Sequence, residues 1–174
     1  MSFSLVPDRV FETYNMLTPA YLSERGIDAL LIDIDNTLAP YEQPLPDDGH
    51  RAWFTEMAEA GIKCVLVSNN SADRVELFAK SLGVPAYADC KKPLTKRIKK
   101  IMIDNGIDVT TAAFLGDQLL TDGWTARNFG VPIFIVPPIK DKTTAFFRFK
   151  RWLEVPFMKK YYRLHPDDVK EVTK

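Results

Sequence analysis

Two aspartates, Asp33 and Asp35, directly follow the apolar run 29–32 and are separated by a single isoleucine. The run is typical of a buried β-strand, and two acids at its end are costly, because burial and mutual repulsion both disfavour ionised carboxylates. A bound divalent cation would relieve both costs, since carboxylate and carbonyl oxygens are the ligands that Mg²⁺ prefers. The alternative is a solvated turn, for which Asp-Asn-Thr is equally suitable. The pair alone does not separate a metal site from a turn.

Other apolar runs of the chain also lead into polar or charged side chains. A serine and an asparagine follow the run 62–67, an aspartate follows 111–116, and two lysines come shortly after 84–88. These residues are Ser68, Asn69, Asp117, Lys91 and Lys92, with Asp122 five positions beyond Asp117. In a parallel α/β sheet, ligands bind beyond the carboxyl ends of the strands, so these side chains are expected at one edge. Acids, a hydroxyl and a cation together indicate a phosphate and metal site.

Apolar runs and helical patterns alternate along the chain and predict the sheet that positions these residues. Strands are expected over 28–35, 62–68, 84–88, 111–117 and 131–138. Helices are expected over 18–26, 46–61, 71–83, 94–106 and 120–130. This order predicts an α/β fold with a Rossmann-like, doubly wound parallel sheet of about five strands. Pro85 places the short third strand at a sheet edge.

The length of 174 residues predicts a single domain over 1–174, with a core of about 28–138 and a tail over 139–174. The strand ends are too close in sequence for an inserted cap domain between the acids, the serine and the lysines. An open site favours large or surface-borne phosphates, or an oligomer that supplies the missing wall. The loop 36–46 is expected to form a small flap over the entrance.

The composition points to a reducing compartment. The two cysteines, Cys64 and Cys90, have no metal-ligand spacing and do not form a disulfide scaffold. The first residues lack a basic segment followed by an apolar one, and no run approaches 18 apolar residues. We therefore expect a cytoplasmic protein. The balanced net charge of the whole chain points to no partner.

Four motifs, in order over about residues 28–136, resemble those of the haloacid dehalogenase (HAD) superfamily. They are "DIDNT" (33–37), "VLVSN" (65–69), "KKP" (91–93) and "GDQLLTD" (116–122). The longer stretches "GIDALLIDIDNTL" and "GDQLLTDGWTARNFG" resemble the YqeG family of subclass IIIA phosphatases, a group related to the phosphatidylglycerophosphate phosphatases of mitochondria. Asn36 stands where many superfamily members have glycine, although DxDNT is the form of this subgroup.

The resemblance implies a Mg²⁺-dependent phosphomonoester hydrolase that works through an aspartyl-phosphate intermediate. Asp33 would be the nucleophile and a metal ligand. Asp35 would be the general acid and base, with its carboxyl group turned from the metal and its backbone carbonyl a ligand. Asp117 would complete the metal site.

The remaining motif positions would support the phosphoryl group and the metal. Ser68 would donate to phosphoryl oxygens, and Lys92 would neutralise charge on them and on the nucleophile. Lys91 is the rival for that role, and Lys92 is preferred because it directly precedes Pro93. Supporting or phosphate-binding positions are Thr37, Asn69 and Asp122.

The substrate implied by the resemblance is a lipid phosphate such as phosphatidylglycerophosphate. Soluble sugar phosphates, nucleotides and nucleic-acid ends are the alternatives within enzymes. A non-catalytic binding module with the same fold is a further alternative. A phosphoacceptor signalling domain fits less well, because such domains lack the DxDxT and GDxxxxD patterns. The sequence does not set the oligomeric state.

The stretch 139–164 carries eight basic and two acidic residues, a net charge of +6, whereas the rest of the chain carries −6. Seven of the twenty aromatic residues also lie there. This combination suits an anionic membrane surface, and equally an RNA. The alternative is a packing helix, because Phe146, Phe149 and Leu153 have the spacing to face the sheet. The resemblance to lipid phosphatases favours a peripheral membrane contact over RNA.

Overall fold

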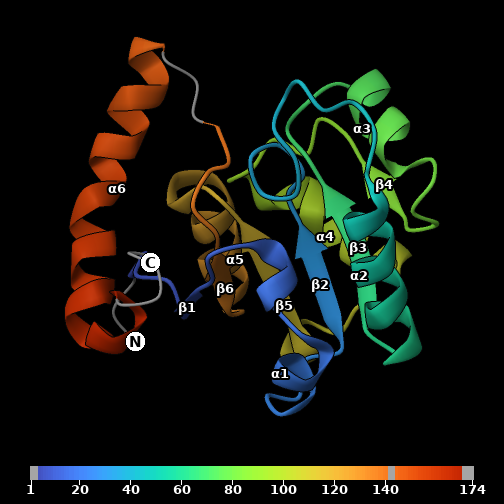
Figure 1. Ribbon diagram of the computed structural model, residues 1–174, viewed down its shortest axis with the longest axis horizontal. Helices are drawn as coiled ribbons and strands as arrows, with labels where there is room; N and C mark the ends of the chain where they lie inside the picture. The colour runs from blue at the N-terminus through green and yellow to red at the C-terminus, as the bar shows by residue number, and fades with distance from the viewer. Residues whose placement is uncertain (1–3, 141–143, 170–174) are drawn as a thin grey trace.

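The computed structural model describes residues 4–140 and 144–169 and contains a parallel six-stranded sheet in the order β1-β6-β5-β2-β3-β4 (Figure 1). The strands are β1 (Arg9–Val10), β2 (Ala29–Ile32), β3 (Lys63–Val67), β4 (Ala86–Tyr87), β5 (Ala112–Gly116) and β6 (Ile133–Ile135). The five predicted strands are all present, each trimmed at its ends, and β4 lies at an edge as Pro85 indicated. The additional strand β1 spans two residues, too few for a periodic pattern.

Within the described residues, six α-helices accompany the sheet. They are α1 (Pro19–Ser23), α2 (Asp48–Glu59), α3 (Ala72–Ala79), α4 (Thr95–Asp104), α5 (Trp124–Phe129) and α6 (Ala145–Leu164). Thr18 caps α1 by accepting a hydrogen bond from the Tyr21 N–H, as its position before Pro19 predicted. The helix expected over 120–130 differs at its start, because Leu119–Gly123 forms a π-helical turn before α5.

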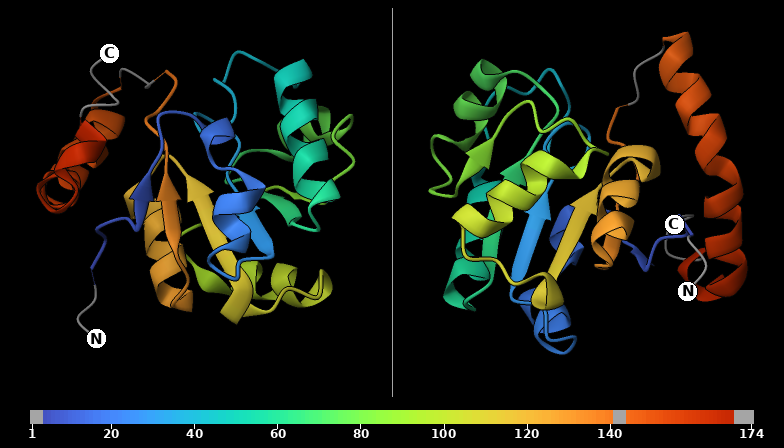
Figure 2. Two further views of the ribbon diagram at one scale, coloured as in Figure 1. Left: turned by 60° about the horizontal axis from the view of Figure 1, so that its bottom comes forward. Right: turned by 180° about the vertical axis from the view of Figure 1, so that it is seen from behind.

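The helices cover both faces of the sheet (Figure 2). On one face, α1, α2 and α3 pack on strand residues that include Leu30 and Ile32. On the other face, α4 and α5 pack on the alternate residues, including Leu31. The sheet is therefore doubly wound, as predicted, and β2 is buried on both sides.

The strand register brings the chemistry-bearing residues to one edge. Ile32 pairs with Leu66 of β3 and with Leu115 of β5. The residues that follow these strands therefore emerge side by side at their carboxyl ends. In the described part of the chain, no extra domain interrupts the path from β2 to β4, because α2 and α3 are the helices between those strands.

Helix α6 stands beside the sheet next to β1 (Figure 1). It is attached through Tyr161, which is fully buried and whose hydroxyl accepts a hydrogen bond from the Val10 N–H at 3.0 Å. The expectation that Phe146, Phe149 and Leu153 face the sheet is wrong. These side chains are exposed, because the fold buries the opposite side of α6, which carries Tyr161 and Glu154.

Among the described residues, no helix combines the length and apolar character that crossing a bilayer requires.

Candidate active site

The centre of the site is an ion-paired group of three side chains from different segments. The Lys92 ammonium lies 2.7 Å from Asp33 Oδ1 and 2.6 Å from Asp122 Oδ1. Burial alone would lower the pKa of Lys92, but the two carboxylates outweigh it and raise that pKa. Lys92 is thus a fixed cation beside Asp33. Lys91 is exposed and pairs with Asp89 at 3.7 Å, which supports Lys92 in the choice between the two lysines.

Three buried carboxylates gather at this point. One oxygen from each of Asp33, Asp117 and Asp122 lies within 4.8 Å of the others. Burial raises the pKa of Asp33 to about 7 although Lys92 opposes the shift. Burial also raises the pKa of Asp117 well above its ordinary value, although Arg151 opposes that shift. Asp117 Oδ1 is buried and has no hydrogen-bond partner in the described part of the chain. Such a group suits a divalent cation, which would favour the ionised acids.

The carboxyl group of Asp35 lies outside this group and has its own partners. Its Oδ2 accepts a hydrogen bond from Asn70 Nδ2 at 2.9 Å, and its Oδ1 accepts one from Arg74 Nε at 3.1 Å. Arg74 also donates to the carbonyls of Pro40 and Pro44, which ties α3 to the loop after β2. Asp35 is therefore oriented by contacts separate from those of Asp33.

The polar residues after β3 support the centre. Ser68 is buried at the pocket wall, and its Oγ accepts a hydrogen bond from the Asn70 N–H. Asn69 holds the Lys92 backbone on both sides, accepting from its N–H at 2.7 Å and donating to its carbonyl at 3.0 Å. Of its two predicted roles, support and phosphate binding, this geometry favours support. Thr37 Oγ1 donates to Asp33 Oδ2 at 3.4 Å.

Two backbone positions explain residue choices in the motifs. Asn36 has φ of 67°, in the left-handed region where glycine and asparagine are best tolerated, so asparagine can replace the glycine of the broader pattern. Gly116 lies against the Asp122 side chain: a Cβ placed at Gly116 would be 2.4 Å from Asp122 Cγ. Glycine at 116 therefore creates the space that the Asp122 carboxylate occupies. The π-helical turn after β5 carries Asp122 into that space.

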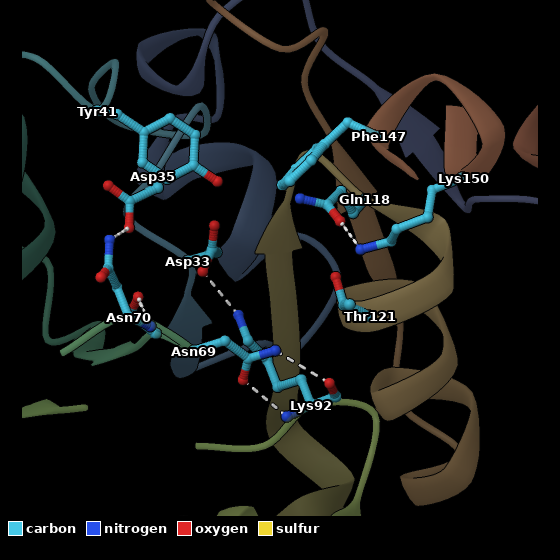
Figure 3. A pocket seen from close by; sticks show the side chains of 11 residues that line it. Asp33, Asp35, Tyr41, Asn69, Asn70, Lys92, Gln118, Thr121, Phe147 and Lys150 are labelled. Carbon is cyan, nitrogen blue, oxygen red and sulfur yellow. Dashed lines mark hydrogen bonds and ion pairs between the residues drawn. The ribbon is translucent and has the colours of Figure 1, made fainter. Parts of the chain in front are cut away.

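The pocket above these groups has a volume of about 250 Å³ and is open to solvent. Its lining residues are Asp33, Asp35, Tyr41, Ser68, Asn69, Asn70, Lys92, Gln118, Thr121, Phe147 and Lys150. Figure 3 shows the rings of Tyr41 and Phe147 on opposite sides of its upper part. Tyr41 comes from the loop predicted to form a flap. Phe147 comes from α6, so two segments outside the sheet form the entrance.

Helix α6 also reaches the carboxylates. Arg151 donates to Asp117 Oδ2 and, at 2.6 Å, to the Asp117 carbonyl. Glu154 accepts from Arg151 at 2.9 Å and from the Leu120 N–H at 3.0 Å. Arg151 therefore holds Oδ2 of Asp117, whereas Oδ1 is buried without a hydrogen-bond partner among the described residues. Lys150 Nζ donates to Gln118 Oε1 at 2.5 Å beside the pocket.

The structure brings together the eight residues that the sequence proposed for this site, with Lys92 rather than its rival Lys91 among them. They are Asp33, Ser68, Lys92, Asp117 and Asp122 at the centre, with Asp35, Thr37 and Asn69 around it. Sequence analysis missed Arg74, although it lies in the first turn of a helix that begins at the same edge. It also missed Arg151 and Glu154, whose inward position depends on how α6 packs and leaves no local signal.

Comparison with known proteins gives one strong relative. No protein-family model matches this sequence. The chain is 33% identical to "Probable phosphatase YqeG" of Bacillus subtilis (strain 168) over 149 residues, which cover 86% of this chain and 87% of the relative.

Solved structures agree in fold. An uncharacterised protein from Listeria monocytogenes serotype 4b matches with a TM-score of 0.53 and 16% identity, over 68% of this chain and 85% of that one. The cobalt-bound deoxy-D-mannose-octulosonate 8-phosphate phosphatase of Haemophilus influenzae matches with a TM-score of 0.50 and 12% identity, over 78% and 91% of the two chains. One third identity across nearly the whole sequence, together with this fold, decides the assignment: the chain belongs to the YqeG family of HAD-superfamily phosphatases.

Proposed function

We propose that this phosphatase is a Mg²⁺-dependent phosphomonoester hydrolase that works through an aspartyl-phosphate intermediate on Asp33. The observation that carries the proposal is the centre itself: Asp33 lines the pocket, is paired with Lys92 and is grouped with two further buried acids. A nucleophilic carboxylate needs a nearby cation to accept a dianionic phosphate, and Lys92 supplies it.

In the first step, the Asp33 carboxylate attacks phosphorus and the bond from phosphorus to the ester oxygen breaks. Asp35 donates a proton to the leaving alkoxide. In the second step, Asp35 takes a proton from water, which attacks phosphorus and releases Asp33 and inorganic phosphate. Ser68 and Lys92 hold the phosphoryl oxygens in both steps. The separate contacts of the two aspartates support these different roles.

The acids also fit a metal ion. Asp33, Asp117 and the backbone carbonyl of Asp35 would hold Mg²⁺, which supplies charge neutralisation at the phosphoryl oxygens. The buried, unpartnered Oδ1 of Asp117 supports this assignment. Asp122 would support the site without being a direct metal ligand, because its Oδ1 pairs with Lys92.

For the substrate we propose a lipid phosphate such as phosphatidylglycerophosphate. The entrance is open and partly aromatic, which suits a leaving group that extends out of the pocket. Lys150 lies at the pocket wall beyond the centre and can meet a second anionic group, such as a phosphodiester. A phosphodiester next to the reacting monoester is what this lipid contains.

A phosphate-release panel tests the proposal. It compares phosphatidylglycerophosphate in detergent micelles with sugar phosphates, nucleotides and a 3′-phosphorylated oligonucleotide, with and without EDTA. The lipid should give the highest kcat/KM, activity should vanish with EDTA and return with Mg²⁺, and beryllium fluoride should inhibit. Preference for a soluble phosphate would overturn the substrate, whereas activity that survives EDTA would overturn the metal assignment.

A further inference from the structure

The outward side of α6 is a surface of exposed apolar and basic side chains, here called the outer face. The exposed fractions of Phe146, Phe149 and Trp152 are 68%, 55% and 66%. The side chains taken as the outer face are Phe146, Arg148, Phe149, Trp152, Leu153, Val155, Lys159, Lys160, Arg163 and Leu164. Soluble surfaces rarely expose so many large apolar side chains on one helix, so this face needs a partner.

The charge of α6 is sorted between its two sides. Its one acidic residue, Glu154, is buried against Arg151 and the Leu120 N–H on the inward side. Within the described helix, the outer face therefore carries cations and no acid. The three exposed rings of Phe146, Phe149 and Trp152 lie in the first half of this 20-residue helix. The cations Lys159, Lys160 and Arg163 lie in its second half.

We propose that the outer face of α6 docks the protein on an anionic lipid bilayer. Rings and aliphatic side chains enter the interface, and the cations meet the lipid charges, as in amphipathic helices that lie on membranes. The exposed aliphatic residues Leu153, Val155 and Leu164 favour lipid over RNA, because they cannot stack on bases. A second copy of the chain fits less well, since it would bring like charges together.

Docking would place the active site at the membrane surface. Phe147 and Lys150, which line the pocket, lie on the inward side of the same helical turns that expose Phe146 and Phe149. A phosphate at headgroup level could then enter the pocket without leaving the bilayer. This consequence rests on the proposed function, whereas docking itself does not.

Sedimentation with vesicles tests docking without using activity. Phosphatidylglycerol and phosphatidylcholine both carry only phosphodiesters, so neither lipid is a substrate of a phosphomonoesterase. The assay therefore measures docking separately from the proposed activity. Binding to phosphatidylglycerol vesicles should exceed binding to phosphatidylcholine at least tenfold and weaken with salt. The variant K159E/K160E/R163E should lose at least about tenfold in binding. Its hydrolysis of a soluble phosphomonoester should stay unchanged.

A matched control makes the same charge change elsewhere. K96E/R97E/K99E reverses three exposed cations on α4 and should retain binding. Equal losses in both variants would mean that only total charge matters and would overturn the assignment to α6. Equal or absent binding to both lipids would overturn docking, as would a dimer in sedimentation equilibrium that is lost in the α6 variant.

A fluorescence measurement reports the rings directly. Trp152 and Trp124 are exposed while Trp53 is buried, so Trp152 is the one exposed tryptophan that remains in a W124F background. Brominated phosphatidylglycerol should quench Trp152 upon binding, and W152F should abolish that quenching. Binding without quenching would show that the rings stay in water and would overturn the proposed orientation.

Discussion

Asp33 and Asp35 are separated by one residue, yet their carboxyl groups contact different side chains. Asp33 pairs with Lys92, and Asp35 pairs with Arg74 and Asn70. The alternation of a strand ceases at Ile32, so the two side chains are no longer forced onto one side. Two neighbouring acids of the same type can therefore act as nucleophile and as acid.

Asparagine at each position should separate the two roles. Asp33→Asn should abolish turnover and give no phosphoprotein, because the attacking oxygen is lost. Asp35→Asn should also stop turnover but accumulate one phosphoryl group on Asp33, because water lacks its base. Intact-mass spectrometry after substrate addition measures this difference. Asp28→Asn, an exposed acid before β2, is the matched control and should behave as wild type. Turnover in Asp33→Asn near the wild-type rate would contradict the mechanism.

Gly116 should tolerate no side chain, because a Cβ there would lie 2.5 Å from Asp122 Cβ as well as close to its carboxylate. Gly116→Ala should displace Asp122, lower kcat, and reduce the free energy of unfolding by about 1–3 kcal/mol. Urea denaturation and steady-state kinetics measure the two effects.

A double-mutant cycle identifies the cause. If Gly116→Ala acts by moving Asp122, the double variant with Asp122→Ala should be no slower than Asp122→Ala alone. Additive losses in kcat would instead place the effect of the new methyl group elsewhere.

At the scale of elements, α6 forms part of the pocket wall and also contacts a buried acid of the site. It contributes Phe147 and Lys150 to the pocket and Arg151 to Asp117. The Glu154 carboxylate accepts a hydrogen bond from Arg151 and so holds the guanidinium group in place. The position of Asp117 therefore depends on a helix that lies outside the sheet.

Arg151→Gln should weaken Mg²⁺ binding, because the Asp117 carboxylate would lose the ion pair at Oδ2 that fixes its orientation. An increase of about 10–100-fold in the Mg²⁺ concentration needed for half-maximal activity is expected. Isothermal titration of Mg²⁺ provides a second readout. Arg148→Gln removes an exposed cation from the same helix and should change neither value. Unaltered Mg²⁺ binding in Arg151→Gln would reduce Arg151 to a structural contact.

Sequence patterns predicted the elements that have their own signals. β2, β3 and β5 are continuous apolar runs, and the polar residues that follow them are fixed by strand direction and register. The site residues Asp33, Ser68 and Asp117 could therefore be found. The two-residue β1 and the packing of α6 could not, because neither shows in local periodicity. The aromatic spacing of α6 suggested the wrong buried side, since the helix packs through Tyr161 and places Arg151 and Glu154 on that same side.

At the scale of the whole molecule, the buried acids should couple metal binding to stability. Because burial raises the pKa of Asp33 to about 7, the folded protein holds a proton there that the unfolded chain releases near pH 4. Protonation of Asp33 therefore stabilises the folded protein fully below about pH 4, and this stabilisation is lost as the pH rises through 7. Mg²⁺ requires the ionised acids, so its stabilisation should increase with pH.

Thermal unfolding at pH 6 and pH 8 checks this coupling. At a Mg²⁺ concentration about 100 times the Kd measured at pH 8, Tm should rise by about 5–10 °C at pH 8. The same Mg²⁺ concentration should raise Tm by less at pH 6. Asp117→Asn should lose most of the increase. A rise in Tm that is the same at both pH values, or that persists in Asp117→Asn, would contradict the assignment of the metal to these acids.

The hydrogen bond from the Val10 N–H to the Tyr161 hydroxyl has a consequence for the sheet edge. β1 is the last strand on its side, and an open edge strand is a template on which another chain can add. Tyr161 occupies one of the donors on that edge, and Asp168 binds both Tyr161 and Arg9. The C-terminal segment thus shields the sheet against strand addition, and chains that lose it should self-associate during storage.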